Sequence, residues 1–152
     1  MNVLKEIQDY IATLPEPKRS EKMELHEMLM QLNIYGTLWF LDGRDALGKV
    51  IANPNIGYGT QTMHYAGGKT REFYQIGLSS NQTGISVYIM GLPDKNFLKE
   101  NYGTTIGKAS VTGYCIKFKT LNDISLEVLQ QVFHKGFEDR WFIGFIPNRA
   151  DF

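Results

Sequence analysis

The stretch that decides the fold runs from residue 54 to residue 90. It reads PNIGYGTQTMHYAGG (54–68), TREFYQIGLSS (70–80) and GISVYIM (84–90). Glycine, tyrosine and β-branched residues dominate it, and apolar and polar residues alternate in its later segments, as they do in half-buried strands. The Gly-Gly pair at 67–68 and the polar cluster at 79–84 are turn signals. The stretch therefore predicts successive strands joined by hairpins, over residues 56–66, 71–78 and 85–90.

Helical patterns flank these strands. Apolar residues recur at helical spacing over residues 3–14, with Asn2 placed to cap the first turn, and a second helix is predicted over residues 17–32. A fourth strand is predicted over residues 111–119, and Ser125 begins a last helix. This order favours an α+β domain. We expect an antiparallel β-sheet with the N-terminal helical hairpin and the C-terminal helix packed on one face.

The segments between these elements give weaker patterns. Residues 38–41 form a short apolar run that periodicity assigns to neither helix nor strand. Residues 45–52 are predicted to form a short helix, and residues 97–102 one helical turn. We assign residues 1–138 to one domain. Residues 139–152 form an apolar tail that we expect to pack on the domain or on a second copy of the chain, in a homodimer.

Bulk composition limits the function classes. The chain has 152 residues, and 16 Lys plus Arg balance 16 Asp plus Glu, so the formal net charge is zero. A dedicated nucleic-acid-binding protein normally carries a basic patch, so no nucleic-acid partner is expected. No run approaches the roughly 20 apolar residues of a membrane span, so no membrane partner is expected either. A single cysteine and a charged, interrupted N-terminal segment predict a cytoplasmic protein.

The residues suited to nucleophilic or zinc chemistry form no complete constellation. His26, His64 and His134 lack the spacings of zinc sites, and Cys115 has no histidine near it in the sequence. We interpret Cys115 as a half-buried strand cysteine, although lysines on the same strand face would favour its thiolate. His26 and His134 are interpreted as surface residues. An enzyme that uses Cys115 or His64 therefore ranks below a binding protein.

One glycine-rich run resembles a phosphate-binding loop. Residues 103–110 read GTTIGKAS, with three residues rather than four between the glycines and with Ala109 where a P-loop has Ser or Thr. We interpret the run as an ordinary connection and keep Lys108 as a candidate for anion binding on its own.

Strand parity divides the predicted sheet into two faces. One face is aliphatic and takes the helices. The other carries polar and aromatic residues, which suits a small-molecule pocket or a protein interface. Its members are Thr60, Thr62, His64, Phe73, Gln75, Ser86, Tyr88, Met90, Cys115 and Lys117. The candidate ligand-binding residues of the predicted sheet and its neighbourhood are His64, Tyr58, Tyr88, Gln75 and Lys108.

Carboxylates recur on the second predicted helix. Glu21, Glu24 and Glu27 are three residues apart, and carboxylates are hard oxygen ligands that can hold a divalent cation. Three basic residues are interleaved with them. A solvated helix face with mixed ion pairs is therefore the alternative interpretation.

Several motifs resemble the YdhG-like domain of unknown function family. They are Tyr10–Ser20 (YIATLPEPKRS) with Leu25-His26, Pro54–Gly59 with His64-Tyr65, Ile76–Ser79, Val87–Met90, Gly107-Lys108, Ile116-Lys117, and Leu121 with Asp123-Ile124. The resemblance spans residues 2 to about 135 in the family's order. The chain departs from the family at Ser80-Asn81-Gln82, where members often have Arg-Lys, and at Gly107–Ser110, where members have Gly-Lys-Ser-Cys.

The resemblance implies a fold and a function. Some family members are described as frataxin-like iron chaperones with an α+β fold. By resemblance we expect a helix-flanked antiparallel sheet and an intracellular iron-binding chaperone that handles iron through acidic surface residues. The alternative is a metal-free module that binds a small molecule or a protein on the mixed sheet face. The zero net charge favours this alternative, because an iron carrier would benefit from an acidic surface.

Overall fold

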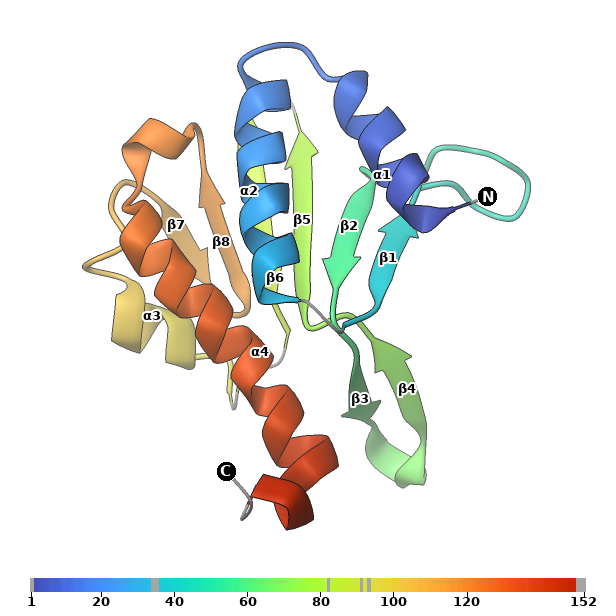
Figure 1. The fold of residues 1–152 in the computed structure, drawn as a ribbon, viewed down its shortest axis with the longest axis vertical. Helices are drawn as coiled ribbons and strands as arrows, with labels where there is room; N and C mark the ends of the chain where they lie inside the picture. The colour runs from blue at the N-terminus through green and yellow to red at the C-terminus, as the bar shows by residue number, and fades with distance from the viewer. Residues whose placement is uncertain (1, 34–35, 82, 91, 93, 150–152) are drawn as a thin grey trace.

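Strands and helices of the computed structural model follow one another along the chain as Figure 1 shows. The strands are β1 (Leu38–Leu41), β2 (Asn55–Tyr58), β3 (Gln61–His64), β4 (Thr70–Phe73), β5 (Ile76–Asn81), β6 (Gly84–Ile89), β7 (Ser110–Thr112) and β8 (Cys115–Phe118). The helices are α1 (Val3–Ala12), α2 (Lys18–Leu32), α3 (Phe97–Tyr102) and α4 (Leu126–Arg149), with single turns η1 (Ala66–Gly68) and η2 (Leu121–Asp123). The structure describes residues 2–33, 36–81, 83–90, 92 and 94–149, and side chains up to residue 138.

A six-stranded antiparallel sheet in the order β1-β2-β5-β6-β8-β7 forms the centre of the fold, and β3 pairs with β4 in a separate hairpin. Helices α1, α2 and α4 pass in front of the large sheet in Figure 1. The side chains that face each other across this layer are buried apolar ones, and their burial is the main stabilising contribution. They include Ile7, Ile11, Leu25, Leu29, Leu129 and Phe133 from the helices and Ile56, Ile76, Leu78, Val87, Ile89 and Ile116 from the strands. The predicted α+β architecture is confirmed.

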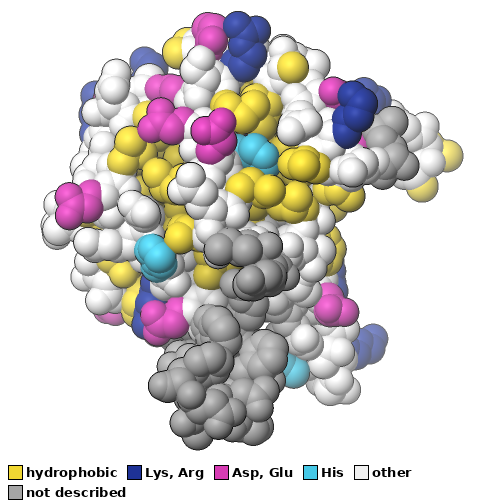
Figure 2. All heavy atoms as spheres, viewed as in Figure 1, with side chains coloured by type: hydrophobic (Ala, Val, Ile, Leu, Met, Phe, Trp, Pro, Cys, Tyr) yellow, Lys and Arg dark blue, Asp and Glu magenta, His cyan; other side chains and the backbone are white. Residues whose placement is uncertain are grey.

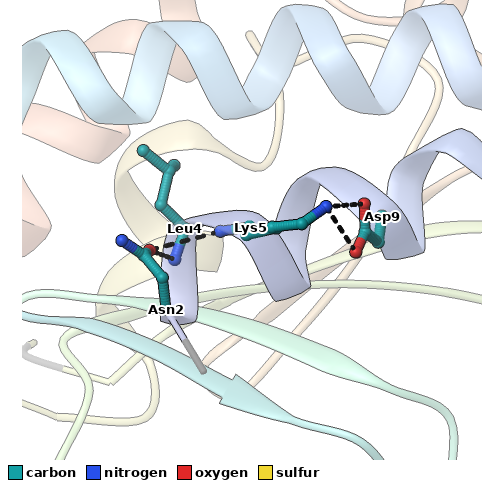
Figure 3. Close-up of polar contacts among 4 residues, drawn as sticks. All are labelled: Asn2, Leu4, Lys5 and Asp9. Atoms are coloured by element: carbon teal, nitrogen blue, oxygen red, sulfur yellow. Dashed lines mark hydrogen bonds and ion pairs between the residues drawn. The ribbon is translucent and has the colours of Figure 1, made fainter.

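The predicted helix caps are present. The Oδ1 of Asn2 accepts hydrogen bonds from the backbone N–H groups of Leu4 at 2.8 Å and Lys5 at 3.3 Å (Figure 3). One turn further on, the Nζ of Lys5 lies 3.2 Å from Oδ1 of Asp9 in an exposed ion pair. Ser125 caps α4 in the same way, by accepting from the N–H three residues on. These contacts satisfy N–H groups that have no partner within a helix.

Two strands that the sequence predicts as continuous are broken by glycines. The predicted strand 56–66 is divided into β2 and β3 at Gly59, whose φ is +78°, and the predicted strand 111–119 is divided into β7 and β8 at Gly113, whose φ is +56°. Positive φ is incompatible with extended backbone. As a result the β3–β4 hairpin leaves the large sheet, and Figure 1 shows it projecting below β2 and β5.

Residues 45–52 form a loop, so the predicted short helix is wrong. The Oδ1 of Asp45 accepts hydrogen bonds from the N–H groups of Leu47 and Lys49, both at 2.9 Å. A side chain that binds nearby backbone N–H groups favours a turn over a helix. Residues 38–41, which periodicity left open, pair with β2 as the edge strand β1. The predicted turn of helix at residues 97–102 is confirmed as α3.

The last helix, α4, continues to Arg149. The side chains of residues 139–152 lie outside the described part of the structure, so the packing expected of the apolar tail stays a prediction. Within the described residues, no helix is both long enough and apolar enough to cross a membrane.

Candidate functional site

Strand pairing places one row of side chains on the sheet face that the helices leave uncovered. Trp39 lies opposite Gly57, Gly57 opposite Gly77, Gly77 opposite Tyr88, and Tyr88 opposite Cys115. Directly paired residues of antiparallel strands point to the same side. Their neighbours along the strands point toward the helices and form the core. Trp39, Tyr88 and Cys115 therefore share what we call the open face.

The ring of Tyr74 packs flat on the open face where two strands carry no side chain. A Cβ atom placed on Gly57 would lie 2.6 Å from Cδ2 of Tyr74, and one on Gly77 would lie 2.5 Å from Cε1 and 2.7 Å from the hydroxyl oxygen. No side chain larger than hydrogen fits at either position while the ring is there. Because Gly77 is paired with Tyr88, the Tyr74 hydroxyl lies next to Tyr88.

Further aromatic side chains extend this surface. The ring centroid of Phe73 lies 4.1 Å from that of Tyr74 and 6.0 Å from that of Trp39. The Nε1 of Trp39 donates a hydrogen bond to the carbonyl oxygen of Gly59 at 2.8 Å, which fixes the indole. The guanidinium of Arg71 lies 4.8 Å from the Phe73 centroid, in cation–π geometry. We call Trp39, Phe73, Tyr74 and Tyr88 the aromatic row; all except Tyr74 are half-buried and present an accessible edge or face.

Two titratable groups of the open face, Tyr74 and Cys115, are held in their protonated forms. Burial raises the pKa of Tyr74 to about 12, and the neighbouring Tyr88 and Cys115 contribute in the same direction. Burial also raises the pKa of the Cys115 thiol, and the nearby Lys117 opposes this only in part. Cys115 is half-buried as predicted, but the expected preference for a thiolate is wrong, because loss of solvent outweighs the lysine charge.

Tyr58, a predicted ligand residue, faces the helices. It is fully buried, and its hydroxyl lies 2.7 Å from Nδ1 of His26 on α2. Burial raises the pKa of Tyr58 well above its usual value and lowers the pKa of His26, so both groups are neutral at pH 7. The interpretation of His26 as a surface residue is therefore wrong. His26 lies on the apolar stripe of α2, and its ring and the Tyr58 hydroxyl form a buried polar pair in the core.

Gln75 is also buried, on the helix side of the fold. Its Nε2 donates weak hydrogen bonds to the carbonyl oxygens of Gly136 at 3.5 Å and Phe137 at 3.4 Å. Its Oε1 has no hydrogen-bond partner among the described residues and lies 2.2 Å from where a Cβ of Gly59 would be. Gln75 thus joins α4 to the bend between β4 and β5 and does not reach the open face.

The remaining predicted ligand residues lie far apart in the fold. His64 is exposed at the end of β3, away from the large sheet, and Lys108 is exposed on the loop that precedes β7. Of the five candidates, Tyr88 alone lies on the open face. The structure therefore does not bring His64, Tyr58, Tyr88, Gln75 and Lys108 together. The alternation of side chains along β6 and β8 correctly placed Ser86, Tyr88, Cys115 and Lys117 on one face. Neither strand is interrupted between these residues.

The three glutamates of α2 also differ in their surroundings. The Oε2 of Glu21 accepts a hydrogen bond from the backbone N–H of Leu121 at 2.9 Å, so this carboxylate anchors η2 to the helix. Glu24 and Glu27 are exposed, and Figure 2 shows acidic side chains on and beside α2 next to hydrophobic ones. Within the described residues, no group of three side chains has the composition and spacing to hold a metal ion.

Sequence reasoning missed a buried lysine. Lys22 is fully buried, and its Nζ donates hydrogen bonds to Oγ of Ser80 at 2.9 Å and to the hydroxyl of Tyr10 at 3.3 Å. Burial, followed by the charge of Lys18, lowers the pKa of Lys22 to about 7. A signal was present: Lys22 lies three residues before Leu25 and therefore on the buried stripe of α2.

We compared the chain with protein-family models, with curated proteins and with solved structures, and none of them matches it. The resemblance to the YdhG-like family therefore stays a prediction that rests on the motifs alone.

Proposed function

We propose that this protein is a binding module that takes a planar ligand on the open face of its sheet. The observation that supports this most directly is the aromatic row. Its half-buried rings lie beside the ring of Tyr74, which packs on the backbone of Gly57 and Gly77. Aromatic side chains with one accessible face stack on planar ligands and lose little conformational entropy when they do. The cation of Arg71 at one end of the row suits a ligand that is electron-rich or negatively charged.

The protonation states favour binding over nucleophilic chemistry. Tyr74 and Cys115 both have raised pKa values, so the face offers a neutral phenol and a thiol at pH 7. A nucleophile needs a base or a lowered pKa, and neither group has one. The Tyr74 hydroxyl can donate a hydrogen bond to a ligand that lies along Tyr88.

A titration followed by ¹⁵N–¹H NMR tests this proposal. Indole and adenosine serve as uncharged planar probes. We expect shifts of the Trp39 Nε1–H and of the backbone amides of Tyr88 and Cys115. Tyr88→Ala should weaken binding by about two- to tenfold, the usual contribution of one aromatic contact. Tyr65→Ala is the control. It removes an exposed tyrosine from the β3–β4 hairpin and should leave the affinity unchanged.

The opposite pattern would refute the assignment of the open face. Shifts confined to residues outside the aromatic row, or equal weakening by the two alanine variants, would mean that the probes bind elsewhere. Absence of shifts with either probe at millimolar concentration would mean that the row does not accept planar ligands.

Iron carriage, which the family resemblance implies, is a second proposal. Its support is the exposure of Glu24 and Glu27 on neighbouring turns of α2, where carboxylate oxygens are available to a cation. An anaerobic Fe(II) titration tests it, with Glu24→Ala/Glu27→Ala beside the wild type. Glu21 is left unchanged because it anchors η2. Binding that is lost in the double variant would support iron carriage, and equal or no binding in both proteins would refute it.

A further inference from the structure

A cavity opens where the turn between β5 and β6 meets the end of β8. Its volume is about 210 Å³, enough for a tetrahedral oxyanion, and its polar lining comes from Asn81, Thr83, Ser86, Lys117 and Lys119. No carboxylate lines it. Strand parity placed Ser86 and Lys117 on the mixed face, but no sequence pattern pointed to a cavity here, because its residues come from three separate strand ends.

The polar groups of the cavity include donors that have no partner. The side chain of Ser86 is 5% exposed, and its hydroxyl makes no hydrogen bond to any described residue. Lys117 and Lys119 are exposed and form no ion pair within the described residues, where the ion pairs involve other cations. Thr83 is engaged instead, because its hydroxyl donates to Oδ1 of Asn81 at 2.7 Å.

Two more lysines reach the same turn from α2. The Nζ of Lys18 donates a hydrogen bond to the carbonyl oxygen of Asn81, and the Nζ of Lys22 donates to the hydroxyl of the preceding residue, Ser80. Glu21, the carboxylate between them in the sequence, is turned toward η2 and bonds the N–H of Leu121. Lys18 and Lys22 thus contact the turn from the helix side, whereas Lys117 and Lys119 line the cavity on the other side.

We propose that this cavity binds a phosphate-class oxyanion, either inorganic phosphate or the phosphate group of a small ester. Lys117 and Lys119 supply charge-assisted hydrogen bonds, and the Ser86 hydroxyl supplies a neutral one. The anion provides the negative charge that Lys117 and Lys119 lack, because neither lysine forms an ion pair within the described residues.

The position of the cavity distinguishes the two sources of phosphate. Ser86 precedes Tyr88 by two residues on β6, and Lys117 follows Cys115 by two on β8, so both point to the open face. The cavity thus begins about 7 Å along the strands from the end of the aromatic row. An aryl phosphate can place its ring on Tyr88 and its phosphate in the cavity, whereas inorganic phosphate uses the cavity alone. The oxyanion site itself does not depend on the aromatic row being a ligand site.

Thermal unfolding and calorimetric titration test the proposal, in buffers of fixed ionic strength set with sodium chloride. The probes are inorganic phosphate and phenyl phosphate. The test variant is Lys117→Met/Lys119→Met, and the matched control is Lys69→Met/Lys95→Met, which removes the same charge from exposed positions elsewhere. We expect phosphate to raise the Tm of the wild type and of the control. Its dissociation constant should rise about tenfold or more in the test variant.

The two probes separate the sources. Tighter binding of phenyl phosphate than of inorganic phosphate supports an ester with a ring on the open face, and equal binding supports free phosphate. A Tm that does not respond to phosphate, or an equal loss in the test and control variants, would overturn the site.

Discussion

Lys22 lies on the buried stripe of α2, and among the described residues its side-chain nitrogen contacts two hydroxyls and no carboxylate. The ring of Tyr10 lies 5.1 Å from the Nζ and adds a cation–π contact. A lysine without a counter-ion in such a place costs free energy whenever it is charged, which is why its pKa falls to about 7. The folded protein therefore carries Lys22 close to half-protonated at neutral pH.

Replacing Lys22 with methionine should stabilise the protein and change how its stability depends on pH. Between pH 7 and pH 10.5 the unfolded chain binds the Lys22 proton more tightly than the folded protein does. The free energy of unfolding of the wild type therefore rises with pH in this window. Below pH 7 the protein is destabilised by the full free energy of burying the protonated Lys22 side chain. Lys22→Met removes this contribution, which amounts to about 5 kcal/mol at most.

Urea unfolding at pH 6.5, 7.5 and 8.5, in buffers without oxyanions, measures this effect. The stability difference between Lys22→Met and wild type should be largest at pH 6.5 and shrink as the pH rises. Lys69→Met serves as the control, because Lys69 is exposed. Stability curves that stay parallel across the three pH values would contradict a lowered pKa for Lys22.

A second residue-scale prediction concerns the glycine beneath Tyr74. Gly77→Ala places a Cβ atom 2.5 Å from the tyrosine ring, so the ring must move, and we expect a loss of about 1–3 kcal/mol. In a Tyr74→Leu background, which lacks the distal ring atoms, the same substitution should cost less than about 1 kcal/mol. Urea unfolding of the four proteins gives the coupling. Additive losses would mean that Tyr74 does not occupy this position.

For single residues, the sequence predicts which face of a strand a side chain occupies, but not which other element packs over that face. Alternation along β6 and β8 placed Tyr88 and Cys115 correctly, because those strands are unbroken. Gln75 was placed with them wrongly, because Gly59 bends the chain and α4 packs over the other side. Tyr58, named only as a candidate ligand residue, is covered by α2. Contacts between residues far apart in sequence, such as Tyr58 with His26, leave no local pattern.

Among the elements, α1 offers the clearest test of a sequence signal. Asn2 caps it with two hydrogen bonds, and no other side chain does so. Asn2→Ala should lower the free energy of unfolding by about 1 kcal/mol, the usual value of an N-cap. Asn2→Asp keeps an acceptor and adds a charge that suits the helix N-terminus, so it should retain or raise stability. Equal losses in both variants, measured by urea unfolding, would contradict the capping role.

Element types were predicted better than element ends. Both N-terminal helices, the last helix and most strands of the large sheet follow from periodicity and capping residues, whereas periodicity left β1 undecided. The breaks at Gly59 and Gly113 were not anticipated, because a glycine in a strand pattern is compatible with extended backbone until tertiary packing selects positive φ. Residues 45–52 were assigned to a helix although Asp45 prefers to bind local backbone N–H groups.

Across the whole molecule, the order of elements was sufficient to predict an α+β fold with helices on one face. The candidate site was not predictable in the same way. The aromatic row combines side chains from β1, β4 and β6 with Tyr74 from the bend between β4 and β5, and only the pairing order of the strands brings them together. The cavity beside the turn between β5 and β6 likewise depends on the pairing of β6 with β8, which brings Ser86 next to Lys117.

The apolar tail gives a prediction for the molecule as a whole. Residues 140–152 include Trp141, Phe142 and Ile143, which water solvates poorly. Deleting residues 140–152 should lower the Tm or convert a dimer to a monomer. Thermal unfolding and sedimentation analysis measure the two outcomes. A truncated protein with unchanged Tm and unchanged association state would show that the tail is dispensable.

The projecting β3–β4 hairpin also has a practical use. At its tip, an added side chain on Gly67 or Gly68 would meet nothing within 4 Å, while its base holds Phe73 in the aromatic row. Both glycines have positive φ, so a short peptide tag is better inserted between them than substituted for either. A fluorophore or surface tether placed there would leave the core intact. Because Phe73 at the base of the hairpin belongs to the aromatic row, such a fluorophore would lie on the same hairpin as part of the proposed ligand site.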